Sequence, residues 1–406
     1  MSSPVISSPR FSATWASVSF DLMRGVAAFI VLYEHWRNLL FVDYGDIHAH
    51  RLLLAPMYLI ATAGHSAVVV FFVLSGYFIG GTVFRAVESG EWRWSSYLLR
   101  RFVRLWTVLL PGLLLCLLWD RLGLHLGHAP SLYAGQGSNH MLIAPVLANL
   151  SPHAFFGNLF FLQGIRSPLY GSNTALWSIS YEFWYYILFP LGLLAVLGGG
   201  RGGRGVLARR IACAAAFLLI ASLVGHQILT EFPVWLAGAL LAKVPPPRFS
   251  DRTGRRLRII APILYLPVLL SAGRVRLPFP APDYILAAFT FVLLWILLSA
   301  RTAHPARTPA VVFSREIARF SFSLYLVHAP FLTLLTSFAE GDTRRVPGLH
   351  SLGIALLILA ATIVYAYVVA FLTEFRTDAL RRRVEWSFGL RSAPPLLPSN
   401  PLDSVS

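Results

Sequence analysis

The sequence predicts an all-α fold: a polytopic membrane protein with about ten transmembrane helices. Of its 406 residues, 56% are hydrophobic and only 13% are charged, which is about half the charged share of a typical soluble domain. Apolar stretches of about 20 residues recur along the chain, and a helix needs about that length to cross a bilayer. The composition excludes soluble globular domains, disordered chains and disulfide scaffolds.

Ten apolar segments can be placed along the chain in order. They cover residues 20–40, 57–84, 103–119, 174–197, 207–225, 228–243, 258–272, 283–300, 317–337 and 351–373. Only a few residues around Gly225 separate the fifth segment from the sixth. No small-residue cleavage site closes the first segment, so we expect it to remain as a membrane helix.

The basic residues predict the orientation of these helices. Of the 34 basic residues only Lys243 is a lysine, and the arginines lie between the apolar segments instead of forming one face or tail. With ten spans, 26 basic residues fall on the side of the termini and 8 on the other side. Basic residues accumulate on the cytoplasmic side, so we expect both termini to be cytoplasmic. The same distribution argues against nucleic acid as a partner, despite the net charge of +16.

The domain organisation follows from the spans. We expect residues 1–19 to form a cytoplasmic N-terminal segment, residues 20–375 the transmembrane domain, and residues 376–406 a cytoplasmic tail. The long external loop, 120–173, contains an apolar stretch at 153–165 that is too short to span the bilayer. We therefore expect this stretch to be interfacial or re-entrant, and the loop to have a function.

The first helix contains two of the most informative polar residues, Arg24 and His35. They are eleven residues apart, which brings them to within about 20° of the same helix face and separates them by roughly 16 Å along the axis. A polar stripe would thus join the two sides of the membrane. Alternatively, Arg24 is a topology anchor and His35 an interfacial histidine, since helix ends tolerate both residues.

Glu182 is a carboxylate about two turns inside the fourth helix, among tryptophans and tyrosines. Aromatic residues at this position could form an interfacial belt, but a buried carboxylate requires a partner or a water-filled cavity. The pattern therefore favours a functional role for Glu182.

Arginines also cluster where the third helix begins, at Arg100, Arg101 and Arg104. They could bind a polyanion, although composition alone favours ordinary cytoplasmic anchoring. His328 lies alone in a later helix, where a packed or hydrogen-bonded role is the usual one. The spacing of histidines and cysteines predicts no metal site.

Five stretches of the sequence resemble the integral-membrane acyltransferase-3 family in their order and spacing: FDLMRGVAAFIVLYEH, FFVLSGYFIGG, RRFVRLW, LWSISYEFWYYILFP and FSFSLYLVHAP. The resemblance covers about residues 15–375. Four motifs carry over position by position: Arg-X10-His from Arg24 to His35, Arg-X-X-Arg from Arg101 to Arg104, Glu-X-X-aromatic from Glu182 to Tyr185, and Ser-Leu-Tyr-Leu-X-His from Ser323 to His328. The family often has a second acidic residue after the glutamate, where this chain has Phe183, so a mechanism with paired carboxylates is in doubt there.

The resemblance implies a membrane enzyme of the bacterial inner membrane that O-acylates a cell-surface or secreted carbohydrate, or a small molecule. The donor would be cytoplasmic acyl-CoA, most often acetyl-CoA, used as a substrate and not as a permanently bound cofactor. Its partners would be this donor, a hydroxyl acceptor and membrane lipid. Only about 30 residues follow residue 375, which implies the stand-alone form without the family's C-terminal esterase-like domain.

The resemblance also implies roles for individual residues. We expect His35 and Glu182 to be catalytic, with His35 as general base and Glu182 either orienting it or binding the sugar. We expect Arg24, Arg101, Arg104, Tyr185 and His328 to bind substrate, the arginines through the phosphates of CoA. An acyl-histidine intermediate is an alternative mechanism. A secondary transporter or flippase of a polysaccharide system is an alternative function, although no internal repeat favours it, and a non-catalytic assembly subunit is another.

Overall fold

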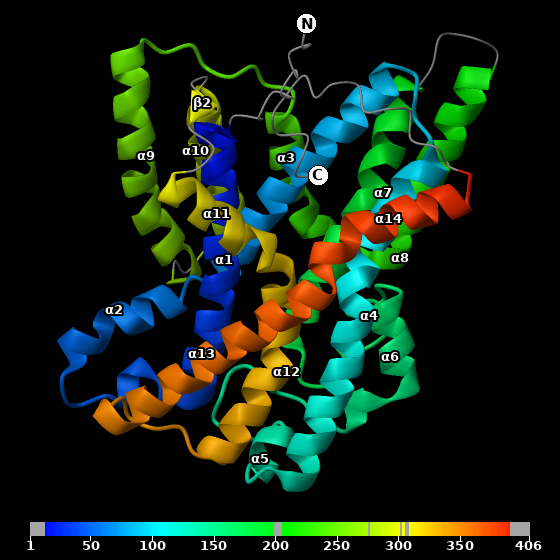
Figure 1. Cartoon of the computed structure of the whole chain (residues 1–406). Coiled ribbons are helices and arrows are strands. Elements are labelled where there is room, and N and C mark those ends of the chain that lie inside the picture. The colour runs from blue at the N-terminus through cyan, green and yellow to red at the C-terminus, as the bar shows by residue number, and fades with distance from the viewer. Residues whose placement is uncertain (1–12, 199–204, 275–276, 301–302, 305–307, 390–406) are drawn as a thin grey trace, which may run out of the picture.

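The computed structural model describes residues 13–198, 205–274, 277–300, 303–304 and 308–389, which form a bundle of helices (Figure 1). The helices are α1 (Trp15–Leu40), α2 (Arg51–Ala61), α3 (Gly64–Glu88), α4 (Trp94–Leu126), α5 (Pro130–Tyr133), α6 (Pro152–Leu159), α7 (Trp177–Leu197), α8 (Gly205–Leu241), α9 (Asp251–Ser271), α10 (Ala281–Leu298), α11 (Pro309–Arg319), α12 (Ser321–Ala339), α13 (Leu349–Leu372) and α14 (Thr377–Ser387). Short 3-10 helices are η1 (Tyr44–Asp46), η2 (Ala148–Leu150), η3 (Thr174–Leu176), η4 (Ala272–Arg274) and η5 (Glu374–Arg376).

The structure confirms the predicted all-α, polytopic class. The strands that it describes are β1 (Ala13–Thr14) and β2 (Ala303–His304), which pair antiparallel over two residues each. Residues 1–12 of the expected N-terminal segment and 390–406 of the expected tail lie outside the described residues.

Nine helices in the described part of the chain are long and apolar enough to cross a membrane, and α8 is one of them. This helix is interrupted at Gly225, where φ is 79° and ψ is 175°, a conformation that glycine adopts far more easily than other residues. Before the interruption, Val206 lies against Gly198 of α7 and Phe217 lies against Gly192. The first arm of α8 therefore runs antiparallel to α7.

The second arm of α8 runs in the opposite direction. Phe232 stacks on Tyr185 of α7 with ring centroids 5.1 Å apart, and Trp235 packs on Phe189, one turn further along both helices, also at 5.1 Å. This arm is thus parallel to α7. Because α8 contains two antiparallel arms, nine long helices correspond to ten crossings, the number that the sequence predicts.

Helix boundaries differ from the prediction at two places. α4 begins at Trp94 and continues to Leu126, well beyond the predicted 103–119, because its flanking arginines and polar residues also adopt helical geometry. The predicted span 57–84 is divided, since its first residues belong to α2. Figure 1 shows α2 lying across the bundle at the end opposite to the one where α1 and α9 begin.

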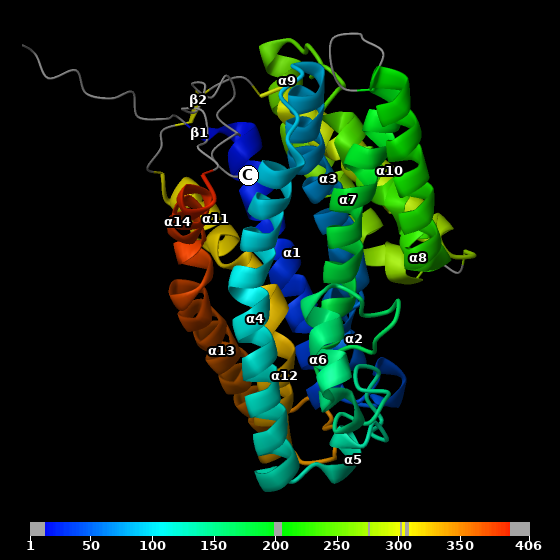
Figure 2. The same ribbon diagram turned by 90° about the vertical axis from the view of Figure 1, so that its right-hand side faces the viewer.

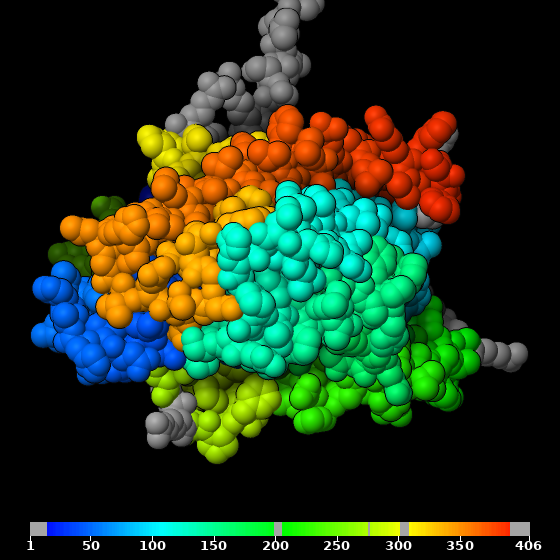
Figure 3. Space-filling model, turned by 90° about the horizontal axis from the view of Figure 1, so that it is seen from below, coloured from blue at the N-terminus to red at the C-terminus, as the bar shows by residue number. Residues whose placement is uncertain are grey.

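The two ends of the bundle differ in chemistry. We call the end where α1, α4 and α9 begin the arginine-rich end, because the arginines in the first half of α4, in the first half of α9, in α11 and in α14 lie there. The opposite end, the loop end, carries α2, α5 and α6 (Figure 2). Seen from this side, α2 and the segment between α4 and α7 cover much of the bundle (Figure 3).

The apolar part of the long loop enters the bundle between α4 and α7. The indole N–H of Trp106 donates to the carbonyl of Leu159 at 2.9 Å, about a third of the way along α4. The carbonyl of Phe161 accepts from Ser180 at 2.9 Å and from Trp184 at 2.8 Å, both on α7. These contacts lie inside the helical bundle, so the segment is re-entrant in geometry and its backbone is satisfied by protein groups.

At the loop end, Asp43 joins three parts of the chain. Its carboxylate accepts from Arg344 at 2.7 Å, from His140 at 2.9 Å and from Arg37 at 3.3 Å. Burial raises the pKa of Asp43, but the hydrogen bond from Arg344, helped by those from His140 and Arg37, outweighs burial and holds the pKa well below its usual range. The end of α1, the long loop and the α12–α13 connection are therefore held together by one charged group.

The depressed pKa predicts a pH-dependent contribution to stability. Asp43→Asn should lower the unfolding temperature of the detergent-solubilised protein at pH 7, because the stabilisation from a depressed pKa is fully present above the unfolded pKa of about 4. The difference in unfolding temperature between wild type and Asp43→Asn should become smaller as the pH falls from about 4 toward the pKa of Asp43 in the folded protein. Asp46→Asn, at an exposed acid three residues away, serves as control. If the difference in unfolding temperature stays constant down to pH 3, the charge of Asp43 does not stabilise the fold.

Candidate functional site

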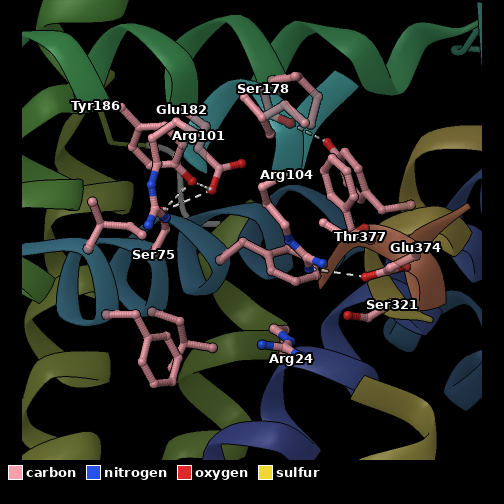
Figure 4. Close-up of a pocket in the computed structure, with 18 of the residues that line it drawn as sticks. Arg24, Ser75, Arg101, Arg104, Ser178, Glu182, Tyr186, Ser321, Glu374 and Thr377 are labelled. Carbon is pink, nitrogen blue, oxygen red and sulfur yellow. Dashed lines mark hydrogen bonds and ion pairs between the residues drawn. The ribbon is translucent and has the colours of Figure 1, made fainter. Parts of the chain in front are cut away.

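A cavity of about 390 Å³ lies at the arginine-rich end, between α1, α3, α4, α7, α12 and the segment from η5 to α14 (Figure 4). Its walls hold more positive than negative charge. The arginines are Arg24, Arg100, Arg101, Arg104, Arg319 and Arg381, and the carboxylates are Glu182, Glu374 and Asp378. Six guanidinium groups against three carboxylates make the cavity suited to an anion with several charges.

Two of these arginines, Arg24 and Arg101, each have a buried N–H donor without a hydrogen-bond partner among the described residues. One terminal nitrogen of Arg24 donates to the carbonyl of Ala318 at 3.1 Å. The Nε atoms of Arg24 and Arg101 are buried and have no hydrogen-bond partner among the described residues. Arg101 otherwise packs over the rings of Tyr97 and Tyr186, at 5.6 and 5.7 Å. A buried N–H without a partner costs free energy, so an anion bound in the cavity would be stabilised by both groups.

Glu182 also lies in this cavity. Its carboxylate accepts hydrogen bonds from Ser75 of α3, at 2.9 Å, and from the hydroxyl of Tyr186. Figure 4 shows Arg101 directed toward the same group. The structure therefore contradicts the expectation that Glu182 orients His35, because its contacts are with the arginine cavity while the imidazole of His35 is held by another residue.

Tyr185 does not reach the cavity either. Its side chain is fully buried and its hydroxyl donates to the carbonyl of Ile228 at 2.8 Å. Tyr186, four residues after Glu182, takes the place at the cavity wall. On a helix, a residue four positions after Glu182 points in a direction closer to that of Glu182 than a residue three positions after it does. Tyr186 therefore lines the cavity, and the predicted Tyr185 does not.

Arg104 is engaged in an ion pair within the protein. Its guanidinium contacts Glu374 at 3.0 Å, and the other oxygen of Glu374 accepts from the backbone N–H and the hydroxyl of Ser323, at 2.9 and 2.8 Å. The Glu374 side chain is only 3% exposed. Arg104 therefore contributes charge to the cavity wall but has fewer free donors than Arg101.

This ion pair predicts a stability effect. Arg104→Ala should destabilise the protein by about 2 kcal/mol, because it leaves the buried carboxylate of Glu374 without its cation; the partial exposure of Arg104 reduces the loss below that of a fully buried pair. Adding Glu374→Gln should recover part of the stability, as seen in unfolding temperatures of the single and double variants. Equal and additive losses would show that the two side chains are not coupled.

His35 is paired with His328. Nδ1 of His35 lies 2.8 Å from Nε2 of His328, and Nδ1 of His328 lies 2.8 Å from the carbonyl of Leu324. A carbonyl can only accept, so His328 carries a proton on Nδ1, and in the neutral ring its Nε2 accepts. His35 then donates from Nδ1, and its Nε2 keeps a lone pair. This arrangement gives His35 the tautomer that a general base needs.

His328 contacts His35 and does not line the arginine cavity, so its expected role in substrate binding stays a prediction. It is fully buried and both ring nitrogens are used within the protein. Its ring is stacked on that of His35, with centroids 4.9 Å apart. The local helix is shaped by Pro330, which has no N–H and so leaves the carbonyl of Leu326 free; the side chain of Asn173 donates to this carbonyl at 2.8 Å.

The cavity and the histidine pair are adjacent. Ser178 and Tyr325 line the inner part of the cavity and their hydroxyls lie 2.6 Å apart. The ring of Tyr325 is 6.4 Å from that of His328, one turn further along α12. Arg24 and His35, which the sequence places on one face of α1, thus lie close to the same cavity. Arg24 lines the cavity, and His35 lies just beyond its inner end.

The structure shows polar groups that the sequence reasoning missed. In the cavity these are Ser75, Tyr186 and Glu374. On the other side of the bundle, His65 contacts Asp283 at 2.9 Å and stacks on Trp177. Charged residues at the ends of apolar segments are the signal that could have identified Glu374, directly after the segment 351–373, and Asp283, at the start of 283–300. Within the described ranges, no group of three or more His, Cys, Asp or Glu side chains is arranged to hold a metal ion.

One comparison with known proteins identifies a family. Residues 17–373 match the family described as an acyltransferase domain, Acyl_transf_3. No curated protein and no solved structure gives a significant match. The match covers most of the chain and includes the histidine pair and five of the six cavity arginines, all but Arg381. The chain therefore belongs to the acyltransferase-3 family and is a membrane acyltransferase.

Proposed function

We propose that the protein transfers an acyl group, most simply acetyl, from cytoplasmic acyl-CoA to a hydroxyl of a cell-surface or secreted carbohydrate. The observation that carries the proposal is the cavity with six arginines, two of which hold buried Nε–H groups without a partner in the described structure. CoA has several phosphate charges and cannot enter hydrocarbon, so its binding requires a positively charged, protein-lined cavity.

The arginine-rich end is proposed to face the cytoplasm of a bacterial inner membrane. The support is the excess of basic residues on that side, 26 against 8. In this orientation the donor cavity opens toward the compartment that contains acyl-CoA, and both termini are cytoplasmic. The acceptor hydroxyl would reach His35 from the opposite side.

The proposed reaction uses Nε2 of His35 as general base. As the acceptor oxygen attacks the thioester carbonyl, its proton passes to Nε2. The carbon–sulfur bond then breaks, and the imidazolium returns the proton to the sulfur, so the products are the O-acyl ester and the free thiol of CoA. Arg24 and Arg101, with Arg104, would hold the donor phosphates, and Glu182, Ser75 and Tyr186 would fix the position of the Arg101 guanidinium.

Acyl transfer can be tested with purified protein and radiolabelled acetyl-CoA, together with mass spectrometry of surface glycans from cells with and without the gene. We expect label to appear in an O-linked ester and one acetyl-ester mass difference to disappear from the glycans of the deletion strain. Movement of an unmodified glycan without consumption of acetyl-CoA would instead support a transporter or flippase. Label retained on the protein in a His35-dependent way would indicate an acyl-histidine intermediate.

A further inference from the structure

A second cavity, of about 870 Å³, lies between α1 and α9 and is separate from the arginine cavity of the proposed active site. Parts of α3 and α10 form its inner wall. In the bundle α9 packs chiefly on α10 and stands at the edge (Figure 1). The cavity is therefore a lateral cleft at membrane depth, and its volume is within the range of ligand-binding sites.

One face of α9 lines the cleft. Arg255, Arg258, Pro262, Leu266 and Leu269 follow one another at intervals of three or four residues, which is the spacing of a single helix face. The face is charged near the start of α9 and apolar further in. A ligand that matches it must have one ionic end and one long apolar part.

The opposite wall, on α1, is apolar. Leu22 is 39% exposed and Val26 is 42% exposed, and across the cleft Leu266 of α9 is 52% exposed. Apolar side chains at this depth are covered by hydrocarbon and not by water. An acyl chain between the two helices would fill the volume that their side chains leave open.

The charged end of the cleft suits an anion. Arg255 and Arg258 form no ion pair among the described residues, whose ion pairs use other arginines. A terminal nitrogen of Arg258 lies close to Gly254, so the side chain extends back toward the arginine-rich end, as long basic side chains do at membrane interfaces. Asp251 also lines the cleft and leaves one net positive charge there.

The surrounding sequence adds to this charge. Five arginines fall within residues 248–258: Arg248, Arg252, Arg255, Arg256 and Arg258. Clusters of this size beside a transmembrane helix are typical of binding to anionic lipid headgroups, and basic pockets between helices bind them specifically.

We propose that the cleft between α1 and α9 binds one anionic phospholipid from the leaflet at the arginine-rich end. Its phosphate contacts Arg255 and Arg258, and one acyl chain lies along Val26 and Leu266. This site is independent of the proposed acyl transfer. A bound lipid would bridge α9 to α1, two helices that otherwise share little contact.

The test uses native mass spectrometry of the full-length protein with phosphatidylglycerol and with phosphatidylcholine of identical acyl chains. We expect wild type to prefer phosphatidylglycerol, and Arg255→Gln/Arg258→Gln to weaken its binding about 30-fold, since each arginine near a bilayer surface contributes about a fivefold factor. Phosphatidylcholine binding should not change. The matched control is Arg252→Gln/Arg256→Gln, which removes the same charge from exposed positions that do not line the cleft.

A second variant separates the apolar part of the site from its charge. Val26→Trp should occupy the cleft and reduce binding of both lipids, and phosphatidylglycerol should raise the unfolding temperature of wild type but not of this variant. An absence of preference for phosphatidylglycerol in wild type would overturn the proposal. Equal losses of phosphatidylglycerol binding in the control and in Arg255→Gln/Arg258→Gln would also overturn it, because they would show general electrostatic attraction instead of a specific site.

Discussion

Replacing His35 by alanine is expected to lower the rate of acyl transfer by at least about 100-fold, while the protein remains folded and inserted in the membrane. General base catalysis typically contributes a factor of about 100 to 10,000, and Nε2 of His35 is the proposed base, since it keeps its lone pair when Nδ1 donates to His328. The rate should be measured with purified protein, saturating acetyl-CoA and a soluble carbohydrate acceptor, and folding by size-exclusion elution and unfolding temperature.

The matched control is His350→Ala, which removes an exposed histidine near the start of α13 and should leave the rate unchanged. Near-normal transfer by the His35 variant would exclude His35 as the base. A loss of transfer accompanied by aggregation would be resolved with His35→Gln, which keeps a polar side chain of similar size; we expect it to fold and to be equally inactive.

Replacing Arg101 by glutamine is expected to raise the apparent KM for acetyl-CoA by about 10- to 100-fold with a much smaller change in kcat. The guanidinium of Arg101 lines the cavity proposed to bind the donor, and a hydrogen bond to a charged group contributes about 1.5–3 kcal/mol. Initial rates should be measured across donor concentrations at low and at high salt. We expect the dependence on salt to be weaker in the variant, because one charge that attracts the phosphates is missing.

Arg209→Gln is the control for this experiment, since Arg209 is exposed on the first arm of α8 and does not line the cavity. An unchanged KM in the Arg101 variant would remove this residue from donor binding. A decrease in kcat at unchanged KM would place Arg101 in transition-state stabilisation instead, which would argue that the donor phosphates bind elsewhere.

Most of the architecture could be predicted from the sequence. Apolar length and the arginine distribution predict how many times the chain crosses the membrane. The structure agrees even at the fifth and sixth segments, which only a few residues separate and where α8 turns at Gly225. Helix ends were less predictable. α4 extends past both predicted boundaries because hydropathy shows where a helix meets hydrocarbon and not where it ends.

The site could be predicted only in part, for a physical reason. Arg24 and His35 share one helix, so periodicity is sufficient to relate them. The relation of His35 to Glu182 depends on how separate helices pack, and the structure places His328 against His35 instead. Similarly, Tyr185 and Tyr186 are adjacent in sequence, and which of them faces the cavity depends on the rotation of α7 against α3 and α8.

The resting histidine pair has a consequence for the energetics of the enzyme in its membrane. The hydrogen bonds are satisfied when both histidines are neutral, and no carboxylate among the described residues is hydrogen-bonded to His35 to favour its charged form. In the proposed reaction the acyl group passes from the sulfur of CoA to the acceptor oxygen, and the proton of that hydroxyl passes through His35 to the sulfur. An acyl group and a hydrogen therefore change places across the membrane, and this exchange carries no net charge. No net charge crosses the bilayer in a complete cycle. A transmembrane voltage, which acts on each translocated charge by about 2.3 kcal/mol per 100 mV, would therefore neither drive nor oppose the overall transfer.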